Sequence, residues 1–223
     1  MKTYQKEFIV FSLRNSVLCF GEYTLKSGRI SPYFFNAGLF NDASAITKLG
    51  EFYADIIEDN FSGQYDLLFG PAYKGIPLAT ATAINLKIKY NCNPDVSFNR
   101  KEEKSHGEGK LIIGSSLKDK RVIIIDDVIT AGITITESIQ LIHNEGGSCL
   151  AVVIMLDRLE RGALTTLSAI QDIVEKNKIK IISIITLNDL IEYLKDIDEN
   201  SAMNRHLKNI LLYQSQYGLL VSR

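Results

Sequence analysis

Short aliphatic runs alternate with amphipathic segments along most of the chain after residue 61, and this alternation constrains the fold more than any other feature. The runs VIII (122–125) and CLAVVIML (149–156) are apolar at every position, which predicts strands buried on both faces. Between them, ITITESIQLIHNEGG (133–147) has apolar residues at helical spacing and glycines at its end. Buried strands separated by helices predict an α/β fold with a central, mostly parallel sheet flanked by helices.

The same patterns assign the rest of the chain to elements. We expect helices over residues 3–20, 42–60, 133–147, 167–178 and 187–196, a loop running into a helix over 71–88, and strands over 65–70, 95–100, 120–127, 149–156 and 179–186. Residues 22–38 predict a hairpin around Gly28. We expect one domain over residues 1–223, made of a helix and hairpin (1–40), an α/β core (41–195) and a C-terminal helix (196–223).

Composition argues against several kinds of partner and location. The 223 residues carry a net charge of −1, so no basic footprint predicts nucleic acid as a partner. Cys19, Cys92 and Cys149 lie far apart, which argues against a disulfide framework or a zinc site and favours a reducing compartment. The apolar run near the N-terminus is too short for a signal peptide, and no segment has the roughly 20 apolar residues of a membrane span. We expect a cytoplasmic protein that binds neither nucleic acid nor membrane.

The stretch VIIIDDVITAGIT (122–134) joins a predicted strand to a predicted helix and carries chemistry. Residues 130–134 lead into the helix, where free backbone N–H groups and the helix dipole favour an anion such as a phosphate. Asp126 and Asp127 would repel the phosphate itself, but ionised carboxylates accept hydrogen bonds from vicinal sugar hydroxyls. The stretch therefore fits a phosphorylated ribose. The alternative, in which Asp126 only caps the helix or belongs to a loop, accounts for one acid and not for two.

This stretch resembles the phosphoribosyl-diphosphate (PRPP) binding motif of type I phosphoribosyltransferases, which has four aliphatic residues, two acids and then a Thr/Gly loop. The motif is specific for that superfamily and does not identify the acceptor base. The resemblance implies the type I phosphoribosyltransferase fold with a small N-terminal hood, formed here by residues 1–40. It also implies that PRPP contacts Asp126, Asp127, Val128, Ile129, Thr130, Ala131, Gly132, Ile133 and Thr134.

A second stretch, RKEEKSHGEGK (100–110), resembles the mobile catalytic loop of orotate phosphoribosyltransferases. Such a loop would act as a cationic lid over a leaving pyrophosphate, and Gly107 and Gly109 would let it move. Its three glutamates offset most of the positive charge, so a solvated surface loop is the alternative. The resemblance implies PRPP contacts from Arg100, Lys101, Lys104 and His106.

A third stretch, LLFGPAYKGIPLA (67–79), resembles the pyrophosphate loop of the same family. Its glycines let the backbone approach an oxyanion, and Lys74 supplies positive charge. An ordinary strand-to-helix turn would account for the glycines but not for the lysine. The resemblance implies PRPP contacts from Tyr73 and Lys74, and a cis peptide at Ala72–Tyr73.

A fourth stretch, TLKSGRISPYFFNAG (24–38), resembles the hood that covers orotate in these enzymes. The resemblance implies that Lys26 reaches the reacting end and contacts PRPP. It further implies that orotate contacts Phe34, Phe35, Thr130 and Arg158. One of the two phenylalanines is expected in the hairpin core. Arg158 would pair with the orotate carboxylate through its planar fork, whereas without the resemblance a surface ion pair with Glu160 or Asp157 is favoured.

Together the four stretches imply an enzyme of the orotate phosphoribosyltransferase family, which converts orotate and PRPP into orotidine 5′-monophosphate and pyrophosphate in pyrimidine synthesis. The catalytic set that the resemblance implies is Lys26, Lys104, His106 and Asp127. Mg²⁺ would be held mainly by PRPP, with Asp126 or Asp127 acting through water. The family forms homodimers in which the lid, here residues 100–110, is shared between subunits.

Three other functions remain open at this point. A phosphoribosyltransferase for a purine or for uracil would share the PRPP motif, but the hood and lid stretches argue against it. A PRPP-sensing regulator would carry a DNA-binding domain or a basic surface, and the sequence indicates neither. A bifunctional enzyme that also decarboxylates the product would need a second catalytic domain, for which the residues after 196 are too few.

Overall fold

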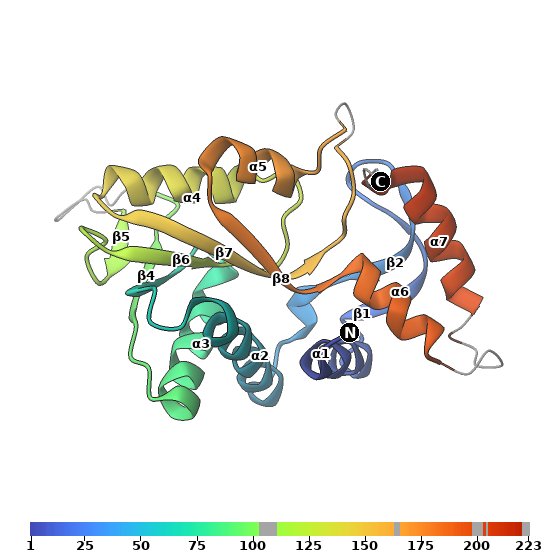
Figure 1. Ribbon diagram of the computed structural model, residues 1–223, viewed down its shortest axis with the longest axis horizontal. Helices are drawn as coiled ribbons and strands as arrows, with labels where there is room; N and C mark the ends of the chain where they lie inside the picture. The colour runs from blue at the N-terminus through green and yellow to red at the C-terminus, as the bar shows by residue number, and fades with distance from the viewer. Residues whose placement is uncertain (103–110, 163–165, 198–202, 204, 220–223) are drawn as a thin grey trace. The chain divides into compact units, whose positions relative to one another are not determined.

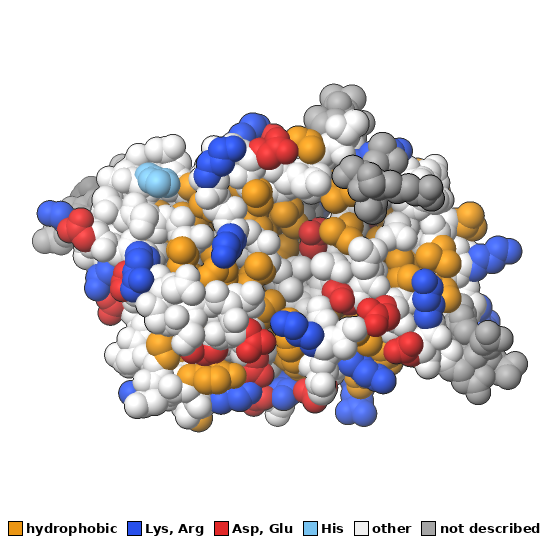
Figure 2. Space-filling view, in the orientation of Figure 1, with side chains coloured by type: hydrophobic (Ala, Val, Ile, Leu, Met, Phe, Trp, Pro, Cys, Tyr) orange, Lys and Arg blue, Asp and Glu red, His pale blue; other side chains and the backbone are white. Residues whose placement is uncertain are grey.

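The computed structural model describes residues 1–102, 111–162, 166–197, 203 and 205–219. The chain divides into two compact units. We call residues 42–155 and 173–184 the sheet unit, and residues 1–41, 156–172 and 185–223 the terminal unit. Figure 2 shows Lys and Arg side chains interspersed with Asp and Glu side chains over the face that it views.

A six-stranded sheet has the strand order β5-β4-β3-β6-β7-β8. Its strands are β3 (Leu67–Gly70), β4 (Asp95–Asn99), β5 (Ile112–Gly114), β6 (Arg121–Ile125), β7 (Ser148–Asp157) and β8 (Lys180–Thr186). Strand β3 pairs in parallel with both β4 and β6, and β6 pairs in parallel with β7. The predicted mostly parallel sheet is therefore confirmed. Its centre is an apolar core, in which Leu67 to Phe69 and Val122 to Ile125 have no exposed surface.

Helices cover both faces of the sheet unit. Figure 1 shows α2 (Ala43–Phe61) and α3 (Gly75–Tyr90) on one face and α4 (Ile133–Asn144) on the other. Helix α2 begins where expected, because the side chain of Asp42 accepts a hydrogen bond from the backbone N–H of Ala45 at 2.8 Å. This arrangement leaves the ends of β3 and β6 for loops that lead directly into α3 and α4.

The terminal unit contains an antiparallel hairpin and several helices. Strands β1 (Leu18–Thr24) and β2 (Ile30–Phe35) form the predicted hairpin, and the 3₁₀ turn Ala37–Leu39 follows it. Helix α6 (Leu187–Lys195) contacts α1 (Thr3–Arg14), and α7 (Arg205–Tyr217) contacts β2. Helix α5 (Ala169–Asn177) leads toward β8. No helix in the described part of the chain is long and apolar enough to cross a membrane.

One predicted boundary needs correction, and one strand was missed. The N-terminal helix ends at Arg14 and not at residue 20, because Ser16 adopts φ 55° and the N–H of Val17 donates back to the carbonyl of Ser12 at 2.9 Å. Val17 and Leu18 are buried as expected, but Leu18 begins β1. The edge strand β5 was not predicted, since its three residues are too few to show a period. It is also antiparallel to β4.

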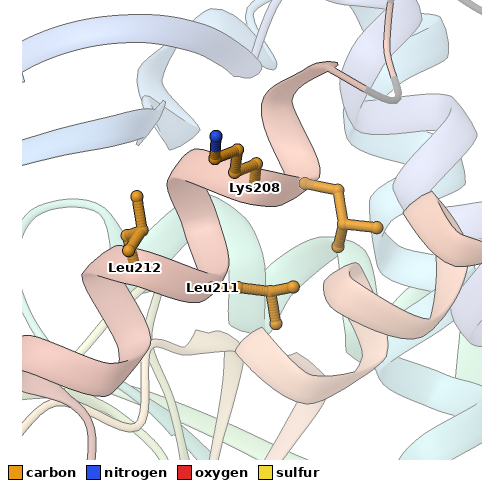
Figure 3. A pocket seen from close by; sticks show the side chains of 4 residues that line it. Lys208, Leu211 and Leu212 are labelled. Atoms are coloured by element: carbon orange, nitrogen blue, oxygen red, sulfur yellow. The ribbon is translucent and has the colours of Figure 1, made fainter.

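The C-terminal helix α7 has one buried face and one exposed face. Ile210 and Tyr213 are buried in the terminal unit, whereas Leu211 is 39 % exposed and Leu212 is 59 % exposed. The exposed face lines a pocket with Leu207 and Lys208 (Figure 3). The helix is therefore attached to its unit through the side that carries Tyr213.

Candidate active site

Two nearly buried carboxylates lie at the carboxyl end of β6. Asp126 is 8 % exposed and Asp127 is 7 % exposed. The backbone N–H of Asp127 donates to Oδ1 of Asp126 at 2.9 Å, and the N–H of Val128 donates to Oδ1 of Asp127 at 2.8 Å. On α2, the hydroxyl of Tyr53 donates to the backbone carbonyl of Asp126 at 2.6 Å. These bonds fix both the backbone and the side chains of the acidic pair.

The carboxyl group of Asp126 is a weaker acid than an ordinary aspartate. Burial, followed by the neighbouring Asp127 carboxylate, raises the pKa of Asp126 to about 7. The hydrogen bond from the N–H of Asp127 and the charge of Lys74 lower the pKa but do not cancel these effects. Asp126 therefore changes its charge near neutral pH, where a bound hydroxyl or cation would shift the balance toward the ionised form.

One turn further on, the chain forms the start of α4. Gly132 is the N-terminal cap at φ 77°, and a Cβ atom there would lie 2.7 Å from Cδ1 of Ile173. The residues around it, Thr130, Ala131, Ile133 and Thr134, are exposed. The first N–H groups of a helix lack partners within the helix. This turn can therefore receive an anion beside the acidic pair.

The loop after β3 is packed closely against the end of β6. A Cβ atom on Gly75 would lie 2.8 Å from the carbonyl oxygen of Ile125. The peptide bond Ala72–Tyr73 is cis, as expected. Lys74 donates from Nζ to Oδ2 of Asp127 at 2.6 Å, although its own side chain is 62 % exposed. The structure thus brings the lysine of one loop onto the carboxylate of the other.

The base of the predicted lid lies beside the same loop. Asn99, at the end of β4, accepts a hydrogen bond from the N–H of Ala72 at 2.8 Å through Oδ1. The Nζ of Lys101 lies 4.8 Å from the ring centroid of Tyr73. Ala72, Asn99, Arg100 and Lys101 line a cavity of about 620 Å³ together with residues of α4 that include Thr134. Lys104 and His106 lie outside the described residues.

The candidates of the hood belong to the terminal unit. Lys26 is exposed in the turn between β1 and β2, which the N–H of Gly28 closes by donating to the carbonyl of Leu25 at 2.9 Å. Phe34 is 39 % exposed and stacks on Tyr23 with ring centroids 5.3 Å apart. Phe35 instead faces Phe8, with ring centroids 6.4 Å apart. Phe35 is therefore the half-buried residue of the pair, and Phe34 is the one that offers a ring to solvent.

Arg158 follows β7 and is held from two sides. Its Nε donates to Oε1 of Glu160 at 2.6 Å, and its Nη2 donates to Oγ of Ser31 at 2.9 Å. The ion pair with Glu160, which was the alternative to a role in substrate binding, is present. It is not a surface pair, however, because the two side chains are only 19 % and 15 % exposed.

The structure gathers the predicted residues into two groups. Within the sheet unit, Lys74 contacts Asp127, Lys101 contacts Tyr73, and Val128 to Thr134 connect the acidic pair with α4. Lys26, Phe34, Phe35 and Arg158 belong to the terminal unit. Sequence reasoning missed Tyr53 and Asn99, which hold the backbone of Asp126 and Ala72. No local pattern marks either residue, because each acts on a partner far along the chain.

Two adjacent carboxylates lie at the end of a parallel strand, and a helix start that can receive an anion follows them. This arrangement is suited to a phosphorylated sugar. It occurs here on a sheet flanked by helices. The family described as phosphoribosyl transferase domain matches residues 39–165. The chain thus carries a phosphoribosyl transferase domain, with the fold of that class.

Similar proteins show which family of phosphoribosyltransferases the chain belongs to. The orotate phosphoribosyltransferases of Pseudoalteromonas translucida (strain TAC 125) and Yersinia enterocolitica are each 52 % identical to this chain over 219 residues, covering 98 % of the chain and 100 % of each relative. The crystal structure of orotate phosphoribosyltransferase from Francisella tularensis matches with a TM-score of 0.84 and 39 % identity, covering 95 % of this chain and 99 % of that one. The chain therefore belongs to the orotate phosphoribosyltransferase family. This confirms the family and the fold that the sequence motifs implied.

Proposed function

We propose that this chain transfers the 5-phosphoribosyl group of PRPP to orotate, giving orotidine 5′-monophosphate and pyrophosphate in de novo pyrimidine synthesis. The observation that carries the proposal is the acidic pair Asp126–Asp127, held between Lys74 and the start of α4. The names of relatives at 52 % identity support orotate as the acceptor. The chain would act in the cytoplasm as a pentosyltransferase.

We assign PRPP to residues of the sheet unit. The start of α4, from Thr130 to Thr134, would receive the 5′-phosphate, because its N–H groups and dipole favour an anion. Asp126 and Asp127 would accept hydrogen bonds from the two ribose hydroxyls. Lys74, Arg100 and Lys101 would neutralise the pyrophosphate, and Tyr73 would contact it from the same loop as Lys74.

Orotate is assigned to residues of the terminal unit. The exposed ring of Phe34 is available to a flat pyrimidine, whereas Phe35 supports the hairpin from its core side. The guanidinium of Arg158 would pair with the orotate carboxylate, a planar group that its fork matches. Thr130 would also contact the base, and Lys26 would act at the reacting end.

The reaction breaks the bond between the ribose C1 and a pyrophosphate oxygen, and it forms a bond between that carbon and orotate N1. The proton on N1 leaves as the new bond forms and passes to solvent or to the departing pyrophosphate, so the protein does not need a strong general base. Positive charge develops on the sugar and negative charge on the leaving pyrophosphate. The protein would therefore act by positioning the two substrates and by placing cations around the leaving group.

Mg²⁺ fits this site as a companion of PRPP. Asp126 and Asp127 are hard oxygen donors of the kind that Mg²⁺ prefers. Within the described residues, no group of three or more His, Cys, Asp or Glu side chains could hold a metal ion. We propose that PRPP supplies most of the ligands and that the pair contacts the ion through water. When bound, Mg²⁺ would neutralise charge on the departing pyrophosphate.

We further propose a homodimer in which the lid, residues 100–110, is shared between the subunits. This follows from the resemblance of RKEEKSHGEGK to the catalytic loop of the family. Lys104 and His106 would reach the leaving pyrophosphate from that loop.

A panel of acceptor bases tests the proposed function. The purified protein is mixed with PRPP, Mg²⁺ and one base at a time, namely orotate, uracil, adenine or hypoxanthine, and pyrophosphate release is measured. Orotate should support turnover at least about a hundredfold faster than the other bases, since only orotate offers a carboxylate to Arg158. Preferred use of another base would discard the acceptor assignment but keep the PRPP site.

A further inference from the structure

We infer that the C-terminal helix α7 sets the position of Arg158 through Glu160 and Tyr213, which makes these two residues positioning residues for recognition of the acceptor's carboxylate. The inference rests on the proposed function, because it takes Arg158 as the group that binds that carboxylate. It gives a role in acceptor specificity to a part of the chain that the sequence motifs leave unassigned.

Arg158 is fixed by contacts on several sides of its guanidinium. Nε is bound to Glu160 at 2.6 Å, and Nη2 is bound to the hydroxyl of Ser31 at 2.9 Å. The face of the guanidinium lies 4.2 Å from the ring centroid of Tyr33, a fully buried residue of β2. Neither hydrogen bond uses Nη1. These contacts hold the side chain in one orientation.

Glu160 is held as firmly as Arg158. The hydroxyl of Tyr213, on α7, donates to Oε1 of Glu160 at 3.0 Å. Nη1 of Arg29 lies 3.5 Å from Oε2. Both carboxylate oxygens are thereby engaged, and the carboxylate balances the charge of a largely buried arginine. Any displacement of Tyr213 would move the carboxylate of Glu160, to which Arg158 is hydrogen-bonded.

The chain after α7 is attached to the segment around Glu160 by backbone hydrogen bonds. The N–H of Arg161 donates to the carbonyl of Tyr217 at 3.0 Å, and the N–H of Leu219 donates to the carbonyl of Leu159 at 2.9 Å. These bonds flank Glu160 on both sides. The end of α7 and residues 159–161 therefore form one connected support, with Tyr213 as its side-chain contact to the carboxylate.

Steady-state kinetics of Glu160→Gln and Tyr213→Phe test this inference. Glu160→Gln keeps the length of the side chain and removes its charge, and it should raise the KM for orotate about tenfold. Tyr213→Phe keeps the ring and removes one hydrogen bond, and it should raise that KM about threefold. The KM for PRPP should stay within about twofold in both variants, because their contacts lie in the support of Arg158.

Matched controls come from a second Tyr–Glu hydrogen bond, between the hydroxyl of Tyr65 and Oε1 of Glu58 at 2.9 Å. Tyr65→Phe and Glu58→Gln make the same chemical changes away from any residue assigned to a substrate. Both should leave the KM for orotate unchanged. A rise equal to that of Tyr213→Phe would mean that the effect is a general loss of stability, and it would overturn the inference.

A double-mutant comparison separates positioning from other effects. Arg158→Ala alone should raise the KM for orotate, and adding Glu160→Gln should raise it no further, because the group that Glu160 positions is gone. Full additivity would overturn the inference.

If Glu160→Gln fails to fold, the KM of Tyr213→Phe for orotate decides alone. If the native protein does not use orotate, the proposed function fails. If Arg158→Ala weakens orotate use but Tyr213→Phe and Glu160→Gln do not, only the inference fails.

Discussion

Lys74 donates a hydrogen bond to the carboxylate of Asp127 across 2.6 Å and so joins the loop after β3 to the loop after β6. The lysine side chain is 62 % exposed and the aspartate side chain only 10 %. Both loops belong to the site that we assign to PRPP. Pyrophosphate would draw the ammonium group away, and the ribose hydroxyls would then replace it on the carboxylate. One ion pair thus joins the two loops that we assign to PRPP.

Lys74→Ala should separate activity from stability. We expect kcat/KM for PRPP to fall about a hundredfold, because a charge aimed at the leaving group is lost. The free energy of unfolding should fall by no more than about 1–2 kcal/mol, because the ammonium group of Lys74 is solvent-exposed although its partner Asp127 is nearly buried. Lys48→Ala, which breaks the partly exposed pair with Glu51 on α2, is the matched control and should keep full activity. Unchanged kcat/KM in Lys74→Ala would contradict the assignment.

The raised pKa of Asp126, about 7, predicts a pH-dependent stability. Between about pH 4 and pH 7 the folded protein keeps a proton on this group that the unfolded chain has released, so the free energy of unfolding falls as the pH rises through this window. The fall from this one group amounts to about 4 kcal/mol at most.

Asp126→Asn should flatten that profile and should be more stable than the native protein at pH 8, because the amide cannot ionise and can still accept from the N–H of Asp127. Urea unfolding at several pH values measures the effect. A variant whose stability falls with pH as steeply as that of the native protein would show that another group titrates.

Asn99 holds the loop after β3 by accepting from the N–H of Ala72 at 2.8 Å, and its Nδ2 donates to the carbonyl of Arg100 at 3.3 Å. Asn99→Leu should lower the free energy of unfolding by about 1–3 kcal/mol, because a backbone N–H loses its acceptor. It should also raise the KM for PRPP. Asn99→Asp keeps the acceptor and should recover most of the stability. Equal losses in the two variants would argue against the hydrogen bond to Ala72 as the cause.

Gly132→Ala should disturb the start of α4 for two reasons. The residue has φ 77°, and the added Cβ would lie 2.7 Å from Cδ1 of Ile173. We expect a loss of about 1–3 kcal/mol in the free energy of unfolding and weaker PRPP binding. Gly63→Ala shares the backbone conformation, with φ 69°, but has open space around it. It should lose less stability and no affinity for PRPP. Equal PRPP affinity in Gly132→Ala and the native protein would contradict the phosphate site.

Lys104→Ala tests the proposed lid. Its kcat should fall far more than its affinity for PRPP, because the lysine would act on the charge that develops as pyrophosphate leaves. Equal losses of kcat and of affinity for PRPP would contradict a role for Lys104 in the transition state. Mixed dimers of a Lys104→Ala chain and an Asp127→Asn chain should regain part of the activity if the lid acts on the partner's site. A stable mixed dimer without activity would argue against sharing.

The sequence predicted the sheet and the PRPP stretch because both depend on local patterns. Val122 to Ile125 are apolar at every position, and the acids and the helix start follow them without a gap. The end of α1 was missed because the apolar spacing of a helix continues into Val17 and Leu18, which instead enter a hairpin. Periodicity alone could not tell Phe34 from Phe35, since neighbouring strand residues face opposite sides and the buried side is set by Phe8 on another element.

Residues that hold the site from a distance escaped sequence reasoning. Tyr53 reaches Asp126 from 73 positions away, and Tyr213 reaches Glu160 from 53 positions away. Such contacts arise only when the sheet and its helices pack, and a lone tyrosine on a helix has no pattern that announces its partner. Arg158 illustrates the converse. A surface ion pair with Glu160 or Asp157 was the alternative to a role in substrate binding, and the pair with Glu160 is present but largely buried.

Orotate consumption is the most direct test of the central claim, which is that the acidic pair at the end of β6 binds PRPP for transfer to orotate. The absorbance of orotate is followed after the purified protein is mixed with PRPP and Mg²⁺, beside a double variant Asp126→Asn, Asp127→Asn. We expect rapid loss of absorbance with the native protein and almost none with the double variant. Equal rates for both proteins would contradict it, because the chemistry would then not depend on the two carboxylates.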